Sequence, residues 1–299
     1  MANNEVLAVD LGQSGCRLKQ GDLLITSDRG KLAGEMPVAS LRAIFESVQK
    51  VSADVVALAL TGLNGLVQEA DTYGQLCAQY FGASQVAVID DGFASFIGAL
   101  EGRDGVVLTI GGGVVSIGGL NEKFAHRDGL GSTFGDEGGG FWLGKAGITK
   151  ALASNQGRND DQEMAKYFAH EIDLYYKLIV CDGAEAQTFA IKTAKKVLDA
   201  ADAGVSTATA IVDEGAYLLA QTVISTWYGC GGAKNDSPEI VIQGGPARNS
   251  TYATKIAMEI NAKLPNAVVV QSAGDNLDGA TWIAQNLNHD VPPFMMWSR

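Results

Sequence analysis

The segment between residues 5 and 15 reads Glu5-Val-Leu-Ala-Val-Asp-Leu-Gly-Gln-Ser-Gly15 and joins a short apolar run to a tight glycine turn. The apolar run predicts a buried strand that ends at Asp10, and the turn contains Gly12, Gln13 and Ser14. Residues 17–25 alternate loosely enough to form a returning strand, which predicts a hairpin. A glycine turn after a strand exposes backbone N–H groups and lets phosphate oxygens approach them closely. This segment therefore predicts an α/β fold with a phosphate-binding turn.

The same arrangement starts again after Gly102-Arg-Asp-Gly105. The strand Val106-Val-Leu-Thr-Ile110 enters the turn Gly111-Gly112-Gly113, and a second strand follows to Gly118. This recurrence indicates a structural duplication. We expect two α/β domains, residues 1–103 and 104–299, around a central cleft with a hinge near residues 100–105. The last predicted helix, at about 276–287, is a candidate to pack back on the first domain.

Further strands and helices follow from the periodicity of apolar residues. In the first half, a helix follows Pro37, a strand spans Val55–Leu60, and strand Val86–Asp90 leads into a helix that opens at Asp91. The second half is rich in helices, which we predict at 136–153, 160–180, 185–202, 206–228 and 250–262. Its strand Glu239–Gln243 ends in a third glycine turn, Gly244-Gly245. Ligands of open α/β sheets bind at such strand ends, so the three turns predict a nucleotide, with two turns at its phosphates and one near its base.

Composition narrows the class of protein. The 299 residues are 46% hydrophobic and 19% charged, which excludes a mainly disordered chain. The net charge of −12 disfavours nucleic acid and anionic membranes as partners, and no apolar stretch is long enough to span a membrane. The N-terminus lacks the basic start of a signal peptide, and Cys16, Cys77, Cys181 and Cys230 form no ligand or disulfide pattern. We therefore expect reduced thiols and a cytoplasmic location.

Three other kinds of site are not supported. Gly139–Lys145 resembles a P-loop, but Ala146 stands where a Mg²⁺-binding Ser or Thr is needed. No G-x-G-x-x-G motif follows the first strand, which disfavours a Rossmann dinucleotide site. His126, His170 and His289 are isolated in the sequence and do not indicate a hydrolase triad.

Three aspartates stand beside strand ends or glycines. Asp10 is placed to hold Mg²⁺ next to the first turn, with capping of that turn as the alternative. Asp91 lies at a strand–helix junction, where it is either a site residue or an ordinary N-cap. Asp136 lies in Gly135-Asp-Glu-Gly138, and the same two interpretations apply. Phosphoryl transfer to a hydroxyl needs alignment, charge neutralisation and one carboxylate that accepts the alcohol proton, so these acids and the glycine turns suit it.

Taken together, these motifs resemble the actin/Hsp70/sugar-kinase superfamily, whose fold is two duplicated, ribonuclease H-like α/β domains around a central cleft. The block His126-Arg-Asp-Gly-Leu-Gly-Ser-Thr-Phe-Gly-Asp-Glu-Gly-Gly-Gly-Phe-Trp-Leu-Gly144 is similar to the N-acetylglucosamine kinase branch of the BadF/BadG/BcrA/BcrD ATPase family. Residues 240–246 resemble the adenosine motif of that family. The resemblance covers nearly the whole chain. It implies an ATP-dependent kinase for the 6-hydroxyl of N-acetylglucosamine or glucosamine, with ATP and Mg²⁺ as cofactors and a homodimeric state.

The family's site residues can be carried over to the matching positions. The resemblance implies that Asp91 is the catalytic base and that Asp10 is the acid associated with Mg²⁺. It implies that the phosphates of ATP meet two turns, whose residues are Gly12, Gln13, Ser14, Gly111, Gly112 and Gly113. The adenosine side would meet Gly244 and Gly245. The sugar would meet Asp91, Gly129, Gly131 and Asp136.

The sequence departs from the family pattern in two places. The second phosphate turn commonly reads Gly-Thr-Gly-Ser, whereas Gly112 and Val114 replace the hydroxyl residues here and leave backbone donors. Residues 27–34 are few and lack the Asn-rich loop that helps to grip an N-acetyl sugar. The sequence therefore leaves three candidates for the sugar substrate: glucosamine, N-acetylglucosamine and a muramyl sugar. Two other functions also stay open: a non-catalytic or differently specific sugar- and ATP-binding sensor, and an activator ATPase, which would need cysteine pairs for an iron–sulfur cluster.

Overall fold

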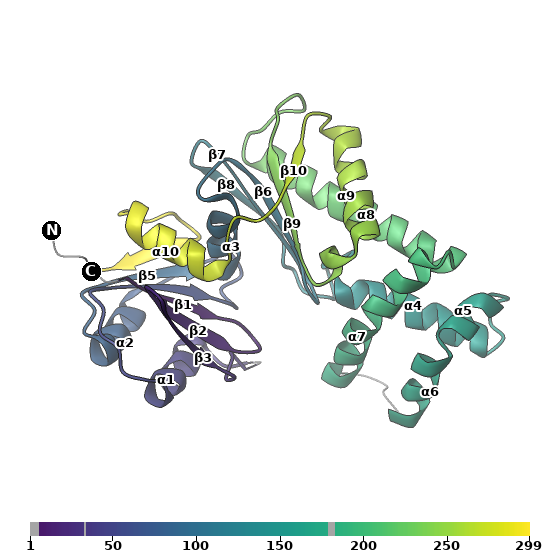
Figure 1. Ribbon diagram of the computed structural model, residues 1–299, viewed down its shortest axis with the longest axis horizontal. Helices are drawn as coiled ribbons and strands as arrows, with labels where there is room; N and C mark the ends of the chain where they lie inside the picture. The colour runs from purple at the N-terminus through teal and green to yellow at the C-terminus, as the bar shows by residue number, and fades with distance from the viewer. Residues whose placement is uncertain (1–5, 33, 179–182) are drawn as a thin grey trace. The chain divides into compact units, whose positions relative to one another are not determined.

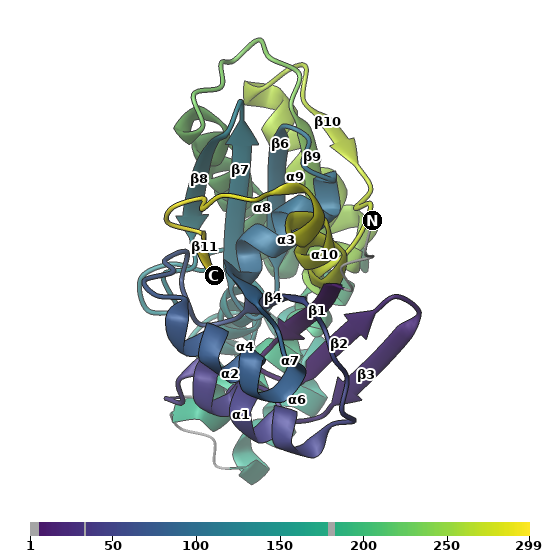
Figure 2. The ribbon, with the colours of Figure 1, turned by 90° about the vertical axis from the view of Figure 1, so that its left-hand side faces the viewer.

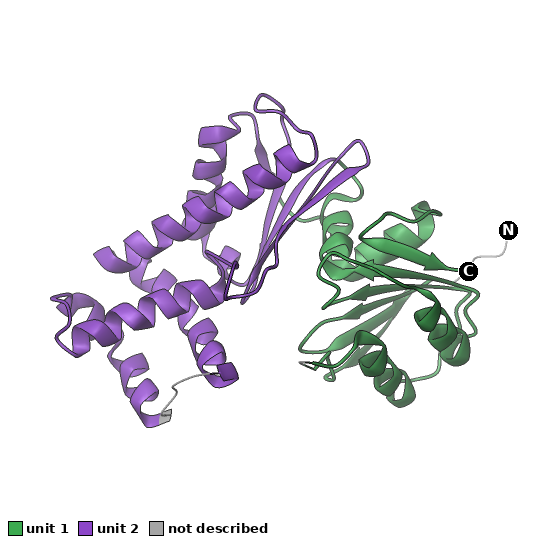
Figure 3. Cartoon of the chain, turned by 180° about the vertical axis from the view of Figure 1, so that it is seen from behind, with its two compact units in different colours: residues 1–103, 271–299 green, residues 104–270 purple. Residues whose placement is uncertain are grey.

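The computed structural model describes residues 6–32, 34–178 and 183–299. Contacts between Cα atoms divide the chain into two compact units, one formed by residues 1–103 and 271–299 and one by residues 104–270 (Figure 3). The C-terminal segment 271–299 belongs to the first unit because its helix and its last strand pack there. Each unit contains a mixed β-sheet with helices packed on it, so the α/β class expected from the sequence is confirmed.

The first unit is built on a six-stranded sheet in the order β11-β5-β4-β1-β2-β3. The strands are β1 (Val6–Leu11), β2 (Cys16–Gln20), β3 (Leu23–Ser27), β4 (Val55–Leu60), β5 (Gln85–Asp90) and β11 (Met295–Ser298). β1, β4 and β5 run parallel, whereas β2, β3 and β11 each run antiparallel to a neighbour. All six residues of β4 are buried, which explains why this strand is a continuous apolar run in the sequence.

Helices cover both faces of this sheet (Figures 1 and 2). α1 (Pro37–Ser47) and α2 (Asp71–Phe81) lie on one face and bury Leu41, Ile44 and Leu76 in its core. α10 (Asn276–Asn286) lies on the other face and packs against α3 (Asp91–Leu100). A Cβ atom on Gly98 would lie 2.1 Å from the carbonyl oxygen of Asp275, and one on Gly279 would lie 1.9 Å from that of Ala94. The two helices therefore approach each other at a distance that only glycine permits.

The second unit repeats this strand arrangement in the order β10-β9-β6-β7-β8. Its strands are β6 (Gly105–Ile110), β7 (Val114–Leu120), β8 (Lys123–Asp128), β9 (Glu239–Gly244) and β10 (Val268–Val270). β6, β9 and β10 are parallel, and β7 and β8 continue from β6 as antiparallel strands. The order and directions match those of β5-β4-β1-β2-β3, so the duplication expected from the sequence is confirmed.

α8 and α9 pack on one face of the second sheet (Figure 1). The helices of this unit are α4 (Gly140–Asn155), α5 (Gln162–Tyr167), α6 (Ala169–Leu178), α7 (Gly183–Asp202), α8 (Ser206–Gly229) and α9 (Ser250–Lys263), with the short 3₁₀ helix η1 (Pro246–Arg248) after β9. α4 packs directly on α7, because Gly144 brings its backbone against the carbonyl oxygen of Ala190. Among the described helices, none has the length and apolar character that a membrane crossing requires.

Several elements differ from the expectations. The returning strand expected at 17–25 is two strands, β2 and β3, because Gly21 adopts a φ of +56° and turns the chain back. The helix expected at 160–180 is divided into α5 and α6, and α4 begins at Gly140 rather than at 136. Asp136 is therefore not the N-cap of that helix; Gly139 is.

Three of the four cysteines are buried, as expected from the sequence. Cys16, Cys77 and Cys230 are free and buried, and burial raises the pKa of Cys16 and of Cys77 to about 12. Cys181 lies outside the described residues. Burial also raises the pKa of Cys230 to about 11, and thiols with such high pKa values are poor nucleophiles at neutral pH.

Candidate active site

The first glycine turn connects β1 to β2 and is braced by the chain around it. The N–H of Gly12 donates to the carbonyl oxygen of Gly15 at 2.9 Å, which closes the turn. The N–H groups of Gln13 and Ser14 make no hydrogen bond to any described residue. Two adjacent free N–H groups at the carboxyl end of a parallel strand are suited to bind phosphate oxygens. This role was expected of Gly12, Gln13 and Ser14 from the sequence, and their geometry is compatible with it.

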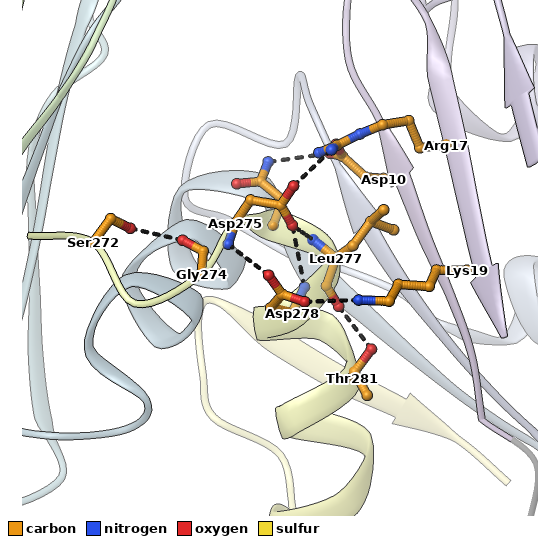
Figure 4. A network of polar contacts seen from close by, with 10 residues as sticks. Asp10, Arg17, Lys19, Ser272, Gly274, Asp275, Leu277, Asp278 and Thr281 are labelled. Carbon is orange, nitrogen blue, oxygen red and sulfur yellow. Dashed lines mark hydrogen bonds and ion pairs between the residues drawn. The ribbon is translucent and has the colours of Figure 1, made fainter. Parts of the chain in front are cut away.

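Asp10 lies beside this turn, and both of its carboxylate oxygens have partners (Figure 4). The strand register places Asp10 opposite Arg17, so both side chains lie on the same face of the sheet. Nη2 and Nε of Arg17 donate to one oxygen at 2.6 and 3.1 Å, and Nδ2 of Asn276 donates to the other at 3.1 Å. Asp10 therefore connects the first turn to the start of α10.

Two further ion pairs extend this connection. Nη1 of Arg17 lies 2.6 Å from Oδ2 of Asp275, and Nζ of Lys19 lies 2.9 Å from Oδ1 of Asp278. Asp275 is also the N-cap of α10 and forms a capping box with Asp278. Figure 4 shows the side chains of Arg17 and Lys19 reaching toward the first turn of this helix. The network fixes the N-terminus of α10 next to the glycine turn.

These contacts limit how Asp10 could take part in Mg²⁺ binding. In the part of the chain that the structure describes, no group of three His, Cys, Asp or Glu side chains could hold a metal ion. Mg²⁺ that accompanies a nucleotide keeps several waters and needs only one or two carboxylates besides the phosphates. Because both oxygens of Asp10 already accept hydrogen bonds, the residue fits contact with Mg²⁺ through water rather than as a direct ligand.

Asp90 and Asp91 are adjacent in sequence and have different surroundings. Asp90 is buried and is the N-cap of α3, because its Oδ1 accepts from the N–H groups of Gly92 and Phe93 at 3.0 and 3.3 Å. Its Oδ2 accepts from the N–H of Gly65 at 2.8 Å, which holds the loop after β4. Since Asp90 performs the capping, Asp91 is free of the N-cap role that the sequence left open.

Asp91 is the first residue of α3, and its carboxyl group is unusually basic. Burial, together with the negative charges of Asp90 and Asp10, raises its pKa from 3.8 to about 7, although a hydrogen bond from the Thr61 side chain acts in the opposite direction. A carboxylate with a pKa near neutrality is suited to accept a proton from a substrate hydroxyl. Asp10 and Asp91 are thus brought close enough for their charges to interact, in one unit.

In the second unit, the turn Gly111-Gly112-Gly113 is fixed to the start of α4. The N–H groups of Gly140 and Phe141 donate to the carbonyl oxygens of Gly111 and Gly112 at 2.9 and 2.8 Å. These bonds orient the turn, while the N–H groups of Gly112 and Gly113 have no partner among the described residues. The second turn therefore offers the backbone donors that were expected from the sequence.

Asp136 supports this turn from the loop between β8 and α4. Its Oδ1 accepts from the N–H of Val114 at 2.9 Å, and its own N–H donates to Oδ1 of Asp128 at 2.8 Å. Burial raises the pKa of Asp136. The residue lies in the left-handed region with a φ of +61°, as do Gly129 at +70° and Gly131 at +80°. The structure thus places Gly129, Gly131 and Asp136 in one loop, with one oxygen of Asp136 bonded to the strand that follows the turn.

A cavity of about 600 Å³ opens beside the second turn, within the second unit. Its walls are Gly111, Gly112, Gly140, Ile191, Ala194, Lys195, Leu198, Asp199, Gly245, Pro246, Arg248 and Asn249. Backbone from the turns forms one side, and the apolar residues of α7 form the other. This volume and this mixture of backbone and apolar groups are typical of a pocket for a small-molecule ligand. Gly244 does not line the cavity but supports the sheet, since a Cβ there would lie 2.1 Å from the carbonyl oxygen of Ile110 and would keep β9 away from β6.

Several of these residues were not predicted from the sequence. Ile191, Ala194 and Leu198 were assigned only to a helix, because their spacing is that of any helix packed on a core. Arg248 and Asn249 follow the third glycine turn after Pro246 and Ala247, and this closeness was the available signal for them. Arg17 could have been paired with Asp10 from the hairpin register alone.

Three solved structures share this fold over 94% of the chain and 99% of the chains compared. A proposed N-acetylglucosamine kinase from Chromobacterium violaceum has a TM-score of 0.66 at 17% identity. Another from Porphyromonas gingivalis has a TM-score of 0.63 at 14% identity. A ROK family glucokinase from Streptomyces griseus, solved with glucose and AMPPNP, has a TM-score of 0.56 at 15% identity. At these identities, the likeness shows the fold.

A sequence search of curated proteins finds no significant match. The sequence model of one family, however, matches residues 20–281 and so includes most of both units. The matched region contains Asp91, the whole second sheet, the second glycine turn and the cavity beside it, whereas β1, β11 and the first glycine turn lie outside it. The chain belongs to the BadF/BadG/BcrA/BcrD ATPase family.

Proposed function

We propose that this protein is an ATP-dependent sugar kinase that transfers the γ-phosphate of ATP to the 6-hydroxyl of an amino sugar, N-acetylglucosamine or glucosamine. The observation that carries the proposal is the pair Asp90 and Asp91. Asp90 caps α3, which leaves Asp91 at the helix start with a pKa of about 7 and no capping role. A carboxylate with these properties suits transfer of a phosphoryl group to an alcohol, because the alcohol hydroxyl must lose one proton in that reaction.

The second unit supplies the nucleotide site in this proposal. The apolar side chains of Ile191, Ala194 and Leu198 would contact the adenine ring, and Gly245 would lie at its other side. The free N–H groups of Gly112 and Gly113 would bind phosphate oxygens. Backbone donors alone can do this, so the loss of the hydroxyl residues at Gly112 and Val114 is compatible with ATP binding.

The first unit supplies the acceptor chemistry. Ionised Asp91 accepts the proton of the sugar hydroxyl while the hydroxyl oxygen attacks the γ-phosphorus, and ADP leaves with the electron pair of the broken P–O bond. Free N–H groups of Gln13 and Ser14 bind the phosphate oxygens, and Asp10 orients the turn through Arg17. Mg²⁺, when bound with ATP, would neutralise phosphate charge, with Asp10 as its partner through water.

The test is coupled ADP release with Mg·ATP and a panel of glucosamine, N-acetylglucosamine, N-acetylmannosamine, N-acetylmuramate and glucose. We expect turnover with one or two amino sugars, and loss of turnover when Mg²⁺ is chelated. Asp91→Asn should reduce kcat by about 10²-fold or more while ATP still binds in calorimetry. ATP binding without turnover on any sugar would contradict the kinase and favour a sensor. The homodimer and the cytoplasmic location stay predictions.

A further inference from the structure

The segment that follows β3 packs directly on the first glycine turn. A Cβ atom on Gly30 would lie 2.3 Å from the carbonyl oxygen of Gln13 and 2.6 Å from the nitrogen of Gly15. The backbone N–H of Lys31 donates to the carbonyl oxygen of Gly12 at 2.9 Å. Both contacts join residues 30–31 to the first glycine turn, so the backbone of Lys31 is held at the edge of this turn.

The side chain of Lys31 extends from this turn to the loop after β4. A Cβ built on Gly62, which has a φ of +86°, would lie 2.6 Å from Cε and 3.1 Å from Nζ of Lys31. The neighbouring residue Thr61 donates its N–H to the carbonyl oxygen of Leu11 at 3.0 Å, and its side chain hydrogen-bonds to Asp91. The ammonium group therefore lies over the loop that contacts the proposed base, and the lysine stem starts at the turn that would bind phosphate.

The charges around Lys31 differ from those of the other basic side chains nearby. Arg17 pairs with Asp10 and Asp275, and Lys19 pairs with Asp278. Arg29, two residues before Lys31, pairs with Glu35 at 3.1 Å. Lys31 is partly buried and has neither an ion pair nor a hydrogen bond from its ammonium group to the residues that the structure describes. Unlike the charges of Arg17, Lys19 and Arg29, the charge of Lys31 therefore remains available for an anionic ligand.

We propose that Lys31 is a catalytic residue whose ammonium group binds the phosphoryl group during its transfer. This inference rests on the proposed kinase function. The phosphoryl group must reach an acceptor oxygen beside Asp91, and within the first unit Lys31 extends from the first glycine turn to the loop that contacts Asp91. In that step the acceptor oxygen bonds to phosphorus, the bond to the oxygen of ADP breaks, and Asp91 takes the proton. The lysine forms no covalent bond and stabilises the negative charge on the three equatorial oxygens.

The matched variants are Lys31→Met and Lys19→Met, which remove one ammonium group each from neighbouring positions in the first unit. The first measurement needs no sugar: calorimetry of Mg·ADP, and of Mg·ADP with aluminium fluoride, which imitates the phosphoryl group in transfer. We expect Lys31→Met to bind Mg·ADP as the wild type does and to bind the aluminium fluoride complex at least tenfold more weakly. Lys19→Met should bind both ligands normally, because its ammonium group is paired with Asp278.

The second measurement is turnover with whichever sugar is phosphorylated. Lys31→Met should reduce kcat by about 10²–10³-fold, with KM for the sugar changed less than threefold, since the lost contact belongs to the transition state. Equal binding of the aluminium fluoride complex by wild type and variant would overturn the proposal, as would a loss confined to KM for an acidic sugar. If the wild type phosphorylates no sugar but the binding difference persists, the sugar kinase is refuted and the phosphoryl contact of Lys31 stands.

Discussion

Replacing Asp90 and Asp91 one at a time should change the stability of the first unit in opposite directions. Asp90→Ala removes the acceptor of two N–H groups at the start of α3 and of the N–H of Gly65. Loss of an N-cap costs about 1 kcal/mol. A buried donor without a partner costs about 1–3 kcal/mol more. We therefore expect Asp90→Ala to lower the free energy of unfolding by about 2–4 kcal/mol.

Asp91→Asn should instead raise stability at alkaline pH. In the unfolded chain Asp91 releases its proton near pH 3.8, whereas in the folded chain it does so near 7. The folded state therefore binds more protons between these values, and stability falls as the pH rises from about 4 to 7. The pKa of Asp91 differs by about three units between the folded and unfolded chain, which corresponds to a loss of about 4 kcal/mol in the free energy of unfolding. This value is an upper bound, because the side chain is partly exposed and water screens its charge. Asparagine carries no charge, so the variant avoids this loss.

Urea unfolding of both variants and the wild type, followed by circular dichroism at pH 5, 6, 7 and 8, measures these effects. The midpoint of Asp91→Asn should approach that of the wild type at low pH and exceed it increasingly up to pH 8. Asp90→Ala should unfold earlier at every pH. The reasoning fails if Asp91→Asn is destabilised at pH 8, or if its gain does not depend on pH. Either result would mean that Asp91 has a structural role of its own.

Three further predictions concern the reaction, the helix packing and the nucleotide pocket. The kcat/KM of the wild type should rise about tenfold per pH unit below 7 and level off above it, because Asp91 must be ionised to act as base; a pH profile that stays flat from 5 to 8 would exclude this. Gly279→Ala should lower the free energy of unfolding by about 1–3 kcal/mol and lower the melting temperature, since its methyl group would meet the carbonyl oxygen of Ala94. Gln285→Ala, on the exposed side of α10, is the control and should leave the melting temperature unchanged. Ile191→Trp should weaken ATP binding at least tenfold in calorimetry, because the larger side chain would fill part of the cavity of about 600 Å³. The melting temperature should not fall. An unchanged affinity for ATP would mean that the adenine ring binds elsewhere.

The fold was largely predictable because its determining features are local. Apolar runs such as Val55–Leu60 can be buried strands, and glycines directly after them mark tight turns. What the sequence did not reveal were two edge strands, β8 and β11. β8 alternates buried and exposed residues only weakly, and β11 is four residues near the C-terminus whose partner, β5, is about 200 residues away in sequence. Their pairing depends on tertiary contacts that no local pattern encodes.

The candidate site was predictable in its glycines and less so in its charges. Asp90 and Asp91 follow the same strand and precede the same helix, so composition and spacing cannot tell which one caps. Only the direction of each carboxylate assigns the N-cap to Asp90. Lys31 had no sequence signal at all, because a lysine in a polar loop is usually solvated. Its importance comes from Gly30 and Gly62, whose missing side chains let the lysine lie across the site.

The duplication is consistent with the proposal that each unit contributes different groups to the reaction. In each unit, the turn after the first strand and the loop after the fourth strand are neighbours, because those strands are parallel partners: Leu11 pairs with Leu60, and Ile110 with Gly244. In the first unit charged side chains surround these positions: Asp10 lies in β1 just before the turn, Lys31 follows β3, and Asp91 follows β5. This arrangement suits charge stabilisation and proton transfer in the proposed reaction. In the second unit they consist of glycines beside a cavity whose α7 wall combines Ile191, Ala194 and Leu198 with Lys195 and Asp199, which suits the nucleotide in the proposed reaction. The same topological position therefore has different surroundings in the two halves, and in the proposed reaction the proton transfer would occur in the first unit, beside Asp91.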